Sequence, residues 1–500
     1  MSLNTSMSYL DSPSVQKLSN FFTKHKLSSL FVIISLIFGI YFVFAIPIFW
    51  GADETSHVAR VYQISKGDLH AHKQKHDRVE GGYGGLIPEN LYASILNVNH
   101  DQMNNKSSGN PVIGVRNVDD PLIYKDLGGR KLENGKYVTW GFPNTSAYSP
   151  VSYIPSIIGM KIANVLDVNI YKMLIIMRLC NLLFFIVIIY GALRILETTN
   201  LKWVFFTIAL IPMSLFEGSF VTADTLTIAF VFLFSAIILK ALFYGKKQQL
   251  SAFELCLLVL SAIVIPLLKP GYFPFVGALL LIPAYAIPIK KSYINIGKAI
   301  VIIISALLFL LWTFSTRDVT NSAALIRPGD GWELVSSSEQ LHHILTNPVH
   351  YIIVLIRSLI LEDTKYINEL LGGLGFNFVQ LPGAAIIAIV TSVMLALGIM
   401  EKIHVAWYRI LGIFCTAIFA IGIIFTGMYL TFSNVDAPVV GGVQGRYFLP
   451  VLPFLFGSLI PLIKKRINPD FFTPSKYAIV IMVVFALIVT TIKYTYVTWG

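Results

Sequence analysis

Two adjacent carboxylates, Asp53 and Glu54, directly follow the first long apolar run of the chain. A carboxylate held at a lipid surface can act as a general base that removes the proton from an acceptor hydroxyl. If a helix starts here, His57 and Arg60 share its face, because residues three and four apart are neighbours on a helix. The alternative is structural: Asp53 could cap this helix, with Glu54 completing the capping pair.

Three basic residues in or beside apolar runs are candidates for holding a phosphate, namely Arg446, Lys269 and Arg178. An arginine can donate two hydrogen bonds to phosphate oxygens at once, and a lysine supplies a point charge. In a site of low dielectric constant, such cations would stabilise a departing phosphate anion. The structural alternatives are snorkelling to the interface, an ion pair with Asp224 or Asp53, and, for Arg178, a bond to a neighbouring polar group.

The composition determines which kind of protein must position these groups. Of the 500 residues, 55% are hydrophobic and 13% are charged, whereas a soluble domain carries about 25% charged residues. A chain this apolar cannot cover itself with a polar surface, so soluble, disordered and fibrous proteins are excluded. The sequence therefore predicts an all-α polytopic membrane protein.

The charge and the cysteines have simple explanations in such a protein. The net charge of +11 is attributed to basic cytoplasmic loops that set the topology, and not to nucleic-acid binding. The three cysteines lie in apolar runs and offer neither a disulfide framework nor a cysteine-based zinc site. They are Cys180, Cys256 and Cys415.

The apolar runs predict about eleven transmembrane helices. The first spans 30–49 and follows a basic tail, 1–29, which places the N-terminus in the cytoplasm. Further spans fill 172–316 and 381–500, and basic loops alternate there with loops poor in lysine and arginine. If every basic loop is cytoplasmic, the count closes at eleven spans with the C-terminus outside.

Two long segments are predicted to lie outside the cytoplasm. The polar stretch 50–171 forms a large first extracytoplasmic loop, in which the run 149–166 is interfacial or re-entrant. The stretch 317–380 forms a second loop, and its run 351–361 is too short to cross the bilayer, which predicts an interfacial helix. This topology sends the polar residues of the apolar runs to one outer face and predicts a polar cavity there. These residues are Asp53, Glu54, Arg178, Asn181, Asp224, Lys269, Gln444, Arg446 and Tyr447.

Other known chemistries find little support in the sequence. His72 and His76 are four residues apart and could share a helix face as metal ligands, but lysines surround them and a solvated basic loop is the simpler interpretation. The pair His342 and His343 is also assigned to the surface. The sequence contains no P-loop, no GxGxxG and no GxSxG motif, so nucleotide-driven transport and serine hydrolysis lack support.

The layout resembles the GT-C class of membrane glycosyltransferases, among them the protein O-mannosyltransferases and the lipid A aminoarabinose transferase. The shared features are the carboxylate pair after the first span, the long first outer loop, Tyr-Ser-Pro-Val-Ser-Tyr-Ile-Pro at 148–155, and Arg-x-x-Asn in the next span. More specifically, the chain resembles a bacterial family of predicted membrane proteins of unknown function, DUF2142. The segments that carry this second resemblance are 52–57, 62–65, 148–155, 371–376 and 444–450.

The GT-C resemblance implies transfer of a sugar from a polyprenyl-phosphate donor to a cell-surface glycan, lipid or protein outside the cytoplasm. By position, Asp53 with Glu54 would take the catalytic carboxylate role, and Arg446, Lys269 and Arg178 would hold the donor phosphate. The remaining candidates would line the cavity: His57, Arg60, Tyr148, Tyr153, Asp224, Gln444 and Tyr447. Some GT-C enzymes need a divalent metal such as Mg²⁺ or Mn²⁺ and others do not, and the sequence leaves that requirement open.

Two alternative functions use similar outer-face residues. One is a polymerase or ligase of surface polysaccharide, and the other is a flippase or transporter of lipid-linked sugars. A transporter would place polar residues at mid-bilayer and on the cytoplasmic side, whereas this sequence concentrates them at the outer face. All three readings place the chain in the bacterial cytoplasmic membrane, with its active face outside.

Overall fold

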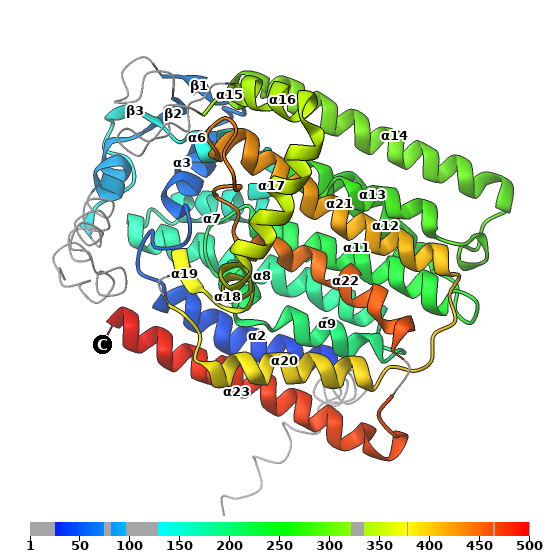
Figure 1. Cartoon of the computed structure of the whole chain (residues 1–500). Helices are drawn as coiled ribbons and strands as arrows, with labels where there is room; N and C mark the ends of the chain where they lie inside the picture. Colours follow the sequence, from blue (N-terminus) through cyan, green and yellow to red (C-terminus); the bar gives the residue numbers. More distant parts are fainter. Residues whose placement is uncertain are drawn as a thin grey trace, which may run out of the picture.

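The computed structural model describes residues 26–74, 82–96, 129–321, 335–377, 379–463 and 466–499. Figure 1 shows long helices running side by side, with the small strands and α3 gathered at one end of the bundle. Among the described residues, seven helical segments are long and apolar enough to cross a membrane, or up to nine if two sharply bent helix pairs each count as one span. The chain is therefore a polytopic, predominantly helical membrane protein, as its composition predicts.

The seven long segments include four of 20 to 26 residues that surround the candidate site. They are α2 (Lys26–Ala45), α8 (Ile170–Ile195), α11 (Asp224–Tyr244) and α21 (Trp407–Phe432). The others are α14 (Lys291–Ser315), the run Gly445–Leu462 and the run Pro469–Trp499. The run Gly445–Leu462 comprises η7 (Gly445–Val451), α22 (Leu452–Leu459) and η8 (Ile460–Leu462), and the run Pro469–Trp499 comprises η9 (Pro469–Phe471) and α23 (Phe472–Trp499).

The first helix differs from its predicted bounds of 30–49, because it ends at Ala45. Pro47 follows two residues later and cannot continue a helix, since it has no backbone N–H. Phe49 then adopts a left-handed conformation with φ +61°. These two residues explain why α2 ends about one turn before the apolar run does. The helix also starts about one turn before the run, at Lys26.

Proline also explains the two bent pairs. Helix α9 (Leu201–Ala209) is bent by 64° against α10 (Pro212–Gly218), and Pro212 occupies the first turn of α10, where its missing N–H costs nothing. Helix α16 (Ser337–Thr346) is bent by 109° against α17 (Pro348–Leu361). Each bend redirects the chain within a few residues.

Helix α17 covers the segment 351–361, for which the sequence predicts an interfacial helix. Figure 1 shows α17 crossing the direction of α21 instead of running beside it. The side of α17 that faces away from the protein is apolar, with Ile352, Ile356 and Ile360 exposed. An apolar outer face on a helix lying across the bundle is what an interfacial position requires.

Three shorter apolar helical segments complete the bundle: α12 (Ala252–Leu268), the run Pro270–Leu281, and α20 (Gly383–Gly398). The run Pro270–Leu281 contains η3 (Pro270–Tyr272), α13 (Pro274–Gly277) and η4 (Ala278–Leu281), and η5 (Ala284–Ala286) follows it. Ser251 and Glu254 form a capping box at the start of α12. At its end, Pro270 disfavours helical geometry in the preceding residue, so Lys269 is extended at φ −145° and leaves the helix.

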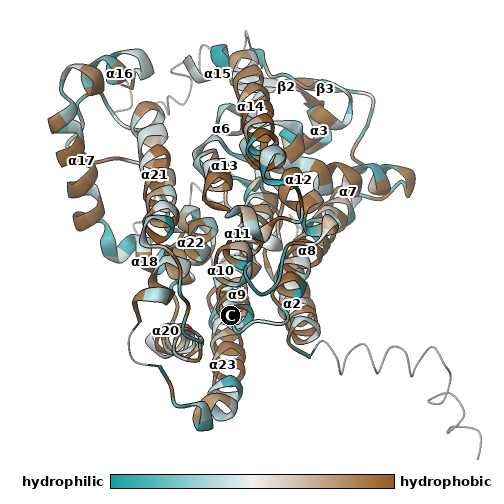
Figure 2. Cartoon of the chain, turned by 90° about the vertical axis from the view of Figure 1, so that its right-hand side faces the viewer, coloured by the Kyte–Doolittle hydropathy of each residue, from teal (hydrophilic) through white to brown (hydrophobic). Residues whose placement is uncertain are grey.

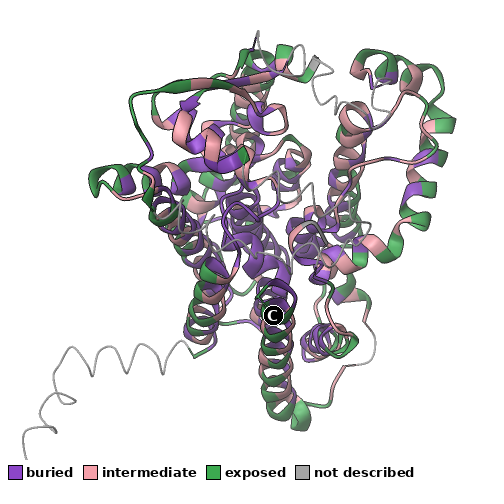
Figure 3. Ribbon diagram, turned by 90° about the vertical axis from the view of Figure 1, so that its left-hand side faces the viewer, coloured by how far each residue is buried: buried purple, intermediate pink, exposed green. Residues whose placement is uncertain are grey.

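Helix α11 lies at the centre of the bundle and is almost completely buried, whereas α14 is buried only at Ile294 and Ser305. Figure 3 shows this contrast between a buried interior and exposed outer helices. Figure 2 shows that the exposed helices, including α14 and α23, carry many hydrophobic residues. A helix that is apolar on all sides belongs in a core or in lipid. Helix α11 is of the first kind and α14 of the second.

The first long loop contains a small antiparallel sheet that the sequence analysis did not predict. Its order is β1 (His72–Lys73), β2 (Tyr83–Pro88) and β3 (Tyr137–Gly141), with His72 opposite Gly84 and Gly84 opposite Gly141. A side chain at Gly84 would lie 1.9 Å from the Trp140 carbonyl oxygen, so this pairing depends on glycine. The glycine-rich sequence lacks the alternation by which strands are recognised.

The described part of the same loop contains α3 (Glu54–Ser65), α6 (Pro143–Ser146), η2 (Pro150–Tyr153) and α7 (Ile154–Val165), and residues 89–96 are also helical. Helix α7 has 12 residues and packs against α8. At 1.5 Å per residue it is too short to cross a bilayer, as predicted for 149–166. The second loop contains α15 (Arg317–Asn321), α18 (Asp363–Leu371) and α19 (Leu374–Asn377) besides the α16–α17 pair.

Candidate functional site

Asp53 stands at the N-cap position of α3 but does not cap the helix. Its backbone is left-handed (φ 57°, ψ 16°), a conformation that aspartate tolerates better than most residues, and its side chain makes no capping hydrogen bond. Instead, Oδ1 accepts a hydrogen bond from Asn144 Nδ2 at 3.0 Å, and Oδ2 lies 3.8 Å from Arg446 Nη2. The side chain is 30% exposed. This carboxylate is therefore accessible and makes no hydrogen bond to the N–H groups of the helix end.

Glu54, its neighbour, is fully buried against Arg178. Arg178 Nε and Nη2 donate to the two Glu54 carboxylate oxygens at 2.8 and 2.5 Å. The same oxygens accept hydrogen bonds from the backbone N–H groups of Gly51 and Val221. The remaining arginine N–H groups donate to three backbone carbonyls at the end of α2, those of Val43, Ile46 and Pro47.

These contacts change the roles expected for both residues of the pair. A guanidinium has five N–H donors, and all five of Arg178 are engaged by Glu54 and the three carbonyls, so none is left for the donor phosphate predicted from the sequence. Glu54 is 0% exposed and cannot meet an acceptor hydroxyl. The pair instead ties α3 and α8 to the end of α2 and to the turn before α11.

Arg446 is buried next to Asp53 but only partly satisfied. It lies on η7 and is 5% exposed, and its Nη1 donates to Glu217 Oε1 at 3.0 Å. Its Nε and the second oxygen of Glu217 are both buried, and neither has a hydrogen-bond partner in the described part of the chain. Buried polar atoms are normally paired, so each exception needs an explanation. A bound polar ligand is one such explanation.

Lys269, at the end of α12, provides a second cation, and 11% of its side chain is exposed. Its Nζ lies 2.5 Å from Asp224 Oδ1, and the ammonium also lies over the rings of Tyr447 (4.8 Å) and Tyr148 (5.4 Å). Asp224 occupies the first turn of α11, where the helix dipole favours negative charge. The Tyr272 hydroxyl donates to the Tyr447 carbonyl and fixes this wall of the site.

His57 and Arg60 of α3 both contact the segment that contains Tyr148 and Tyr153. His57 Nδ1 and the Tyr153 hydroxyl share a hydrogen bond of 2.7 Å, and the imidazole stacks on Tyr148 at 6.1 Å. Burial, with the nearby Lys269 charge, lowers the pKa of His57 to about 3, so the ring is neutral at physiological pH. Arg60 donates to the Tyr148 carbonyl at 3.2 Å and holds this segment in place.

The charged residues form one cluster, here called the Asp53–Arg446 cluster, made of Asp53, Glu217, Asp224, Lys269 and Arg446. It joins the start of α3, the end of α10, the start of α11, the end of α12 and the start of η7, and both cations lie over the ring of Tyr447. These ends therefore lie at the same face of the bundle, which is the gathering of polar residues that the sequence predicts. With every group ionised, the cluster holds three carboxylates and two cations.

A cavity of about 170 Å³ adjoins this cluster. It is lined by residues at and after α6, by the ends of α15 and α16, and by the last turn of α21. Asn144, which bonds Asp53, and Tyr148, which contacts Lys269, are both part of its wall. The cavity is therefore connected to Asp53 through Asn144 and to Lys269 through Tyr148.

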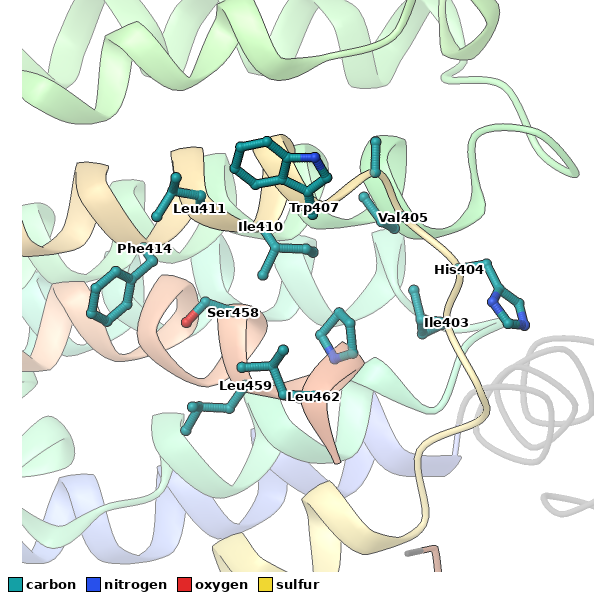
Figure 4. Close-up of a pocket in the computed structure, with 12 residues that line it drawn as sticks. Ile403, His404, Val405, Trp407, Ile410, Leu411, Phe414, Ser458, Leu459 and Leu462 are labelled. Atoms are coloured by element: carbon teal, nitrogen blue, oxygen red, sulfur yellow. The ribbon is translucent and has the colours of Figure 1, made fainter. Parts of the chain in front are cut away.

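A larger cavity, of about 700 Å³, lies at the other end of α21 and is shown in Figure 4. It is lined mainly by apolar side chains such as Trp407, Leu411 and Leu462. About 21 Å of helix lies between Phe414, which lines this cavity, and Met428, which lines the smaller one. Its lining includes His404 and Ser458 but none of the charged residues that surround Asp53 and Arg446, so it is not part of the candidate site.

The remaining predictions have mixed outcomes. Gln444 contributes its main chain, since its carbonyl accepts from Tyr447 N–H at the start of η7. His72 pairs with Asp68 at an exposed position, and His76 lies outside the described residues. Within the described ranges, no group of three or more His, Cys, Asp or Glu side chains is arranged to hold a metal ion.

The sequence analysis did not select three residues that the structure places at the site. Glu217 could have been found, because it is an ionisable residue inside the apolar run 203–220. Asn144 lies in a polar loop and gives no such signal. Glu369 of α18 accepts a hydrogen bond from Gly445 N–H at 2.7 Å and so supports the turn that carries Arg446, a role that only the fold reveals.

Comparison with known proteins gives one match. A family model described as "Predicted membrane protein (DUF2142)" matches residues 36–455. No curated protein and no solved structure matches the chain. The matched region includes every residue of the Asp53–Arg446 cluster.

Proposed function

The chain belongs to the DUF2142 family of predicted membrane proteins, and on this premise we propose that it is a membrane-embedded glycosyltransferase. It moves a sugar from a polyprenyl-phosphate donor to a hydroxyl of an extracytoplasmic glycan, lipid or protein. The observation that carries the proposal is the position of Asp53, a partly exposed carboxylate 3.8 Å from a buried, incompletely paired arginine.

In the proposed reaction, Asp53 accepts the proton of the acceptor hydroxyl as its oxygen attacks the anomeric carbon of the donor sugar. The new bond joins that oxygen to the sugar, and the bond between the sugar and the phosphate oxygen breaks. Its electron pair leaves with polyprenyl phosphate, whose negative charge Arg446 and Lys269 stabilise. No nucleotide is needed, because the lipid phosphate is the leaving group.

The partners of the two cations support this assignment. Glu217 and Asp224 compensate the charges of Arg446 and Lys269, which makes burial of both cations tolerable before a donor arrives. The phosphate would then take up the unpartnered Nε of Arg446 and compete with these carboxylates for the remaining donors. His57, Tyr148, Tyr153 and Tyr447 form neutral walls around the reacting groups, and Arg178 with Glu54 braces the helices beneath.

The proposed topology keeps the GT-C-like layout of about eleven spans. The seven long segments, the α9–α10 pair and the three shorter apolar segments make eleven in the described part of the chain. The run Pro270–Leu281 is as short as α7 and is proposed to cross only together with η5, which follows it. The α16–α17 pair then lies on the outer surface. With the N-terminus in the cytoplasm of a bacterium, this order brings the end of α2, the first loop and the cluster to the extracytoplasmic side.

A transfer assay tests the proposal. Purified protein in liposomes is mixed with a panel of radiolabelled sugars on polyprenyl phosphate, and the release of polyprenyl phosphate is followed for wild type and Asp53→Asn. Asparagine keeps the left-handed backbone and the size of aspartate, so the variant removes only the basic group. We expect release to fall about 10²–10⁴-fold, with donor binding retained.

Asp167→Asn is the matched control, because Asp167 is also left-handed (φ 46°) but lies in an exposed turn away from the cluster. It should leave the release rate unchanged. Equal rates for wild type and Asp53→Asn would remove Asp53 from the mechanism. Tight donor binding without release of any donor's phosphate would overturn the transferase proposal and favour a flippase, which a liposome translocation assay would detect.

A further inference from the structure

The cavity beside the cluster has a lining that selects for one class of acceptor. None of the described residues that line it is charged, and their polar side chains carry an amide and hydroxyls. We propose that this cavity binds the acceptor and that the acceptor is a neutral, hydroxyl-rich carbohydrate. This inference rests on the proposed transferase function and specifies its second substrate.

Three hydroxyls of the lining already donate their protons to backbone carbonyls. Thr431 donates to Gly427 at 2.8 Å and Ser337 to Leu430 at 2.8 Å. Thr320 donates to Thr316 at 3.3 Å. A hydroxyl has one proton and two lone pairs, so each of these oxygens can only accept a hydrogen bond from a ligand. At these three positions the cavity thus presents acceptors to a ligand that brings donors, as sugar hydroxyls do.

The same arrangement disfavours an anionic ligand. A carboxylate or phosphate has only acceptor oxygens when ionised, and these would face the oxygens of Thr320, Ser337 and Thr431 without a proton between them. An unpaired charge or unmatched polar group costs binding free energy, which is how a site rejects the wrong ligand.

The position of the cavity fits an acceptor rather than a second donor. Asn144 lines the cavity and donates to Asp53, so a sugar hydroxyl next to this amide lies beside the proposed base. Tyr148 separates the cavity from Lys269 and from the predicted phosphate position. The apolar side chains of Val319 and Met428 supply contacts for the C–H groups of a sugar ring. One compartment thus holds the hydroxyl and the other holds the leaving group.

Two variants on α21 test the cavity itself. Thr431→Val removes a hydroxyl of the lining with little change in volume, and Thr416→Val removes a hydroxyl with the same bonding pattern, to Gly412 at 2.8 Å, outside the cavity. Binding of a glucose trisaccharide to the purified protein is followed by saturation-transfer NMR, and its transfer KM is measured with the donor that is active in the release assay. We expect Thr431→Val to weaken binding and raise the KM about fivefold, and Thr416→Val to change neither.

The acceptor class is tested with three probes: the glucose trisaccharide, a glucuronic acid trisaccharide and a threonine-containing peptide. Transfer to the neutral trisaccharide, and tenfold less to the other two, is the expected result. Preferential transfer to the acidic sugar or to the peptide overturns this inference and leaves the transferase proposal standing. Absence of polyprenyl phosphate release with every probe overturns the transferase proposal, and absence of trisaccharide binding by NMR overturns the assignment of the cavity.

Discussion

Asp53 and Glu54 are adjacent in the sequence, yet their carboxylates lie in two very different ionic environments. The Glu54–Arg178 pair is completely buried, and all five arginine N–H donors are bonded. Arg446, which faces Asp53, is also buried, but its Nε and one oxygen of Glu217 have no partner among the described residues. Both environments contain a buried arginine, and they differ in whether its hydrogen bonds are complete.

This difference separates a structural ion pair from a candidate binding site. A buried pair whose bonds are complete is rigid and cannot accept a ligand without being broken. A buried cation with an unfilled donor has a strong requirement for a further acceptor. The free-energy cost of burying a charged side chain therefore does not by itself identify a functional residue in a membrane protein. The completeness of the hydrogen bonding decides which intramembrane charge is free to bind.

The largest effect should come from breaking the complete pair. Arg178→Met leaves Glu54 charged and buried without its partner, which should cost about 3–5 kcal/mol in the free energy of unfolding. The measurement is the folded yield and the thermal unfolding midpoint in detergent. Arg357→Met, at an exposed arginine of α17, should change little. A stable Arg178→Met protein with no transfer activity would show that this pair belongs to the site after all.

Arg446→Gln should affect activity far more than stability, the reverse of Arg178→Met. It removes the cation proposed to stabilise the leaving phosphate, so the release rate of polyprenyl phosphate should fall about 10²–10³-fold. The folded yield should fall less than that of Arg178→Met, because Arg446 makes one side-chain hydrogen bond within the described residues and Arg178 makes five. Loss of folded protein comparable with Arg178→Met would erase the distinction between the two environments.

The turn that carries Arg446 offers a sharper test, because it can be displaced without removing any charge. A Cβ at Gly445 would lie 2.0 Å from the Tyr366 carbonyl oxygen and 2.7 Å from Leu370 N, both backbone atoms of α18. Gly445→Ala must therefore shift η7, and a displacement of about 1 Å can cost about 10²-fold in rate. Gly422→Ala on α21 meets no atom within 4 Å, and its release rate should equal that of wild type.

The smallest expected effect concerns the neutral wall of the site. Since the pKa of His57 is lowered to about 3 in the folded protein, the unfolded chain binds more protons between about pH 3 and pH 6.5. The contribution of the neutral His57 ring to the free energy of unfolding is therefore full above pH 6.5. It decreases as the pH falls, by about 2 kcal/mol at pH 5. His57→Asn should flatten the fall of the unfolding midpoint between pH 7 and pH 5. His342→Asn, at an exposed histidine, should leave this pH dependence as in wild type. If the unfolding midpoint falls equally in both variants, His57 is not the group responsible.

The fold was predicted where the physics is local. A run of about 20 apolar residues must lie in lipid or in a core, so the long helices could be located from composition and length. The sheet of the first loop was missed because Gly84 and Gly85 give no alternating pattern and pair with residues more than 50 positions away. The end of α2 was predicted too late because the apolar run continues past Pro47, whereas proline, which has no backbone N–H, ends the helix.

The sequence predicted most of the residues of the candidate site but not which of them contact one another. Polar residues of apolar runs could be assigned to one face from the alternation of loops, and the structure brings Asp53, Asp224, Lys269 and Arg446 together there. The capping role considered for Asp53 could be judged only from the structure, since the left-handed backbone turns its carboxylate away from the helix end. Asn144 and Glu369 could not have been found, because their partners come from distant segments.

By itself, the sequence determined that the chain is a polytopic membrane protein and that costly charges must gather where apolar runs end, because transfer free energies depend on residue type alone. Only the tertiary structure decided which charge pairs with which. Arg178 reaches Glu54 from a helix more than 120 residues away, and Arg446 reaches Glu217 from more than 220 residues away. A carboxylate becomes structural or available according to the donors that distant helices bring to it, and that choice is made by packing.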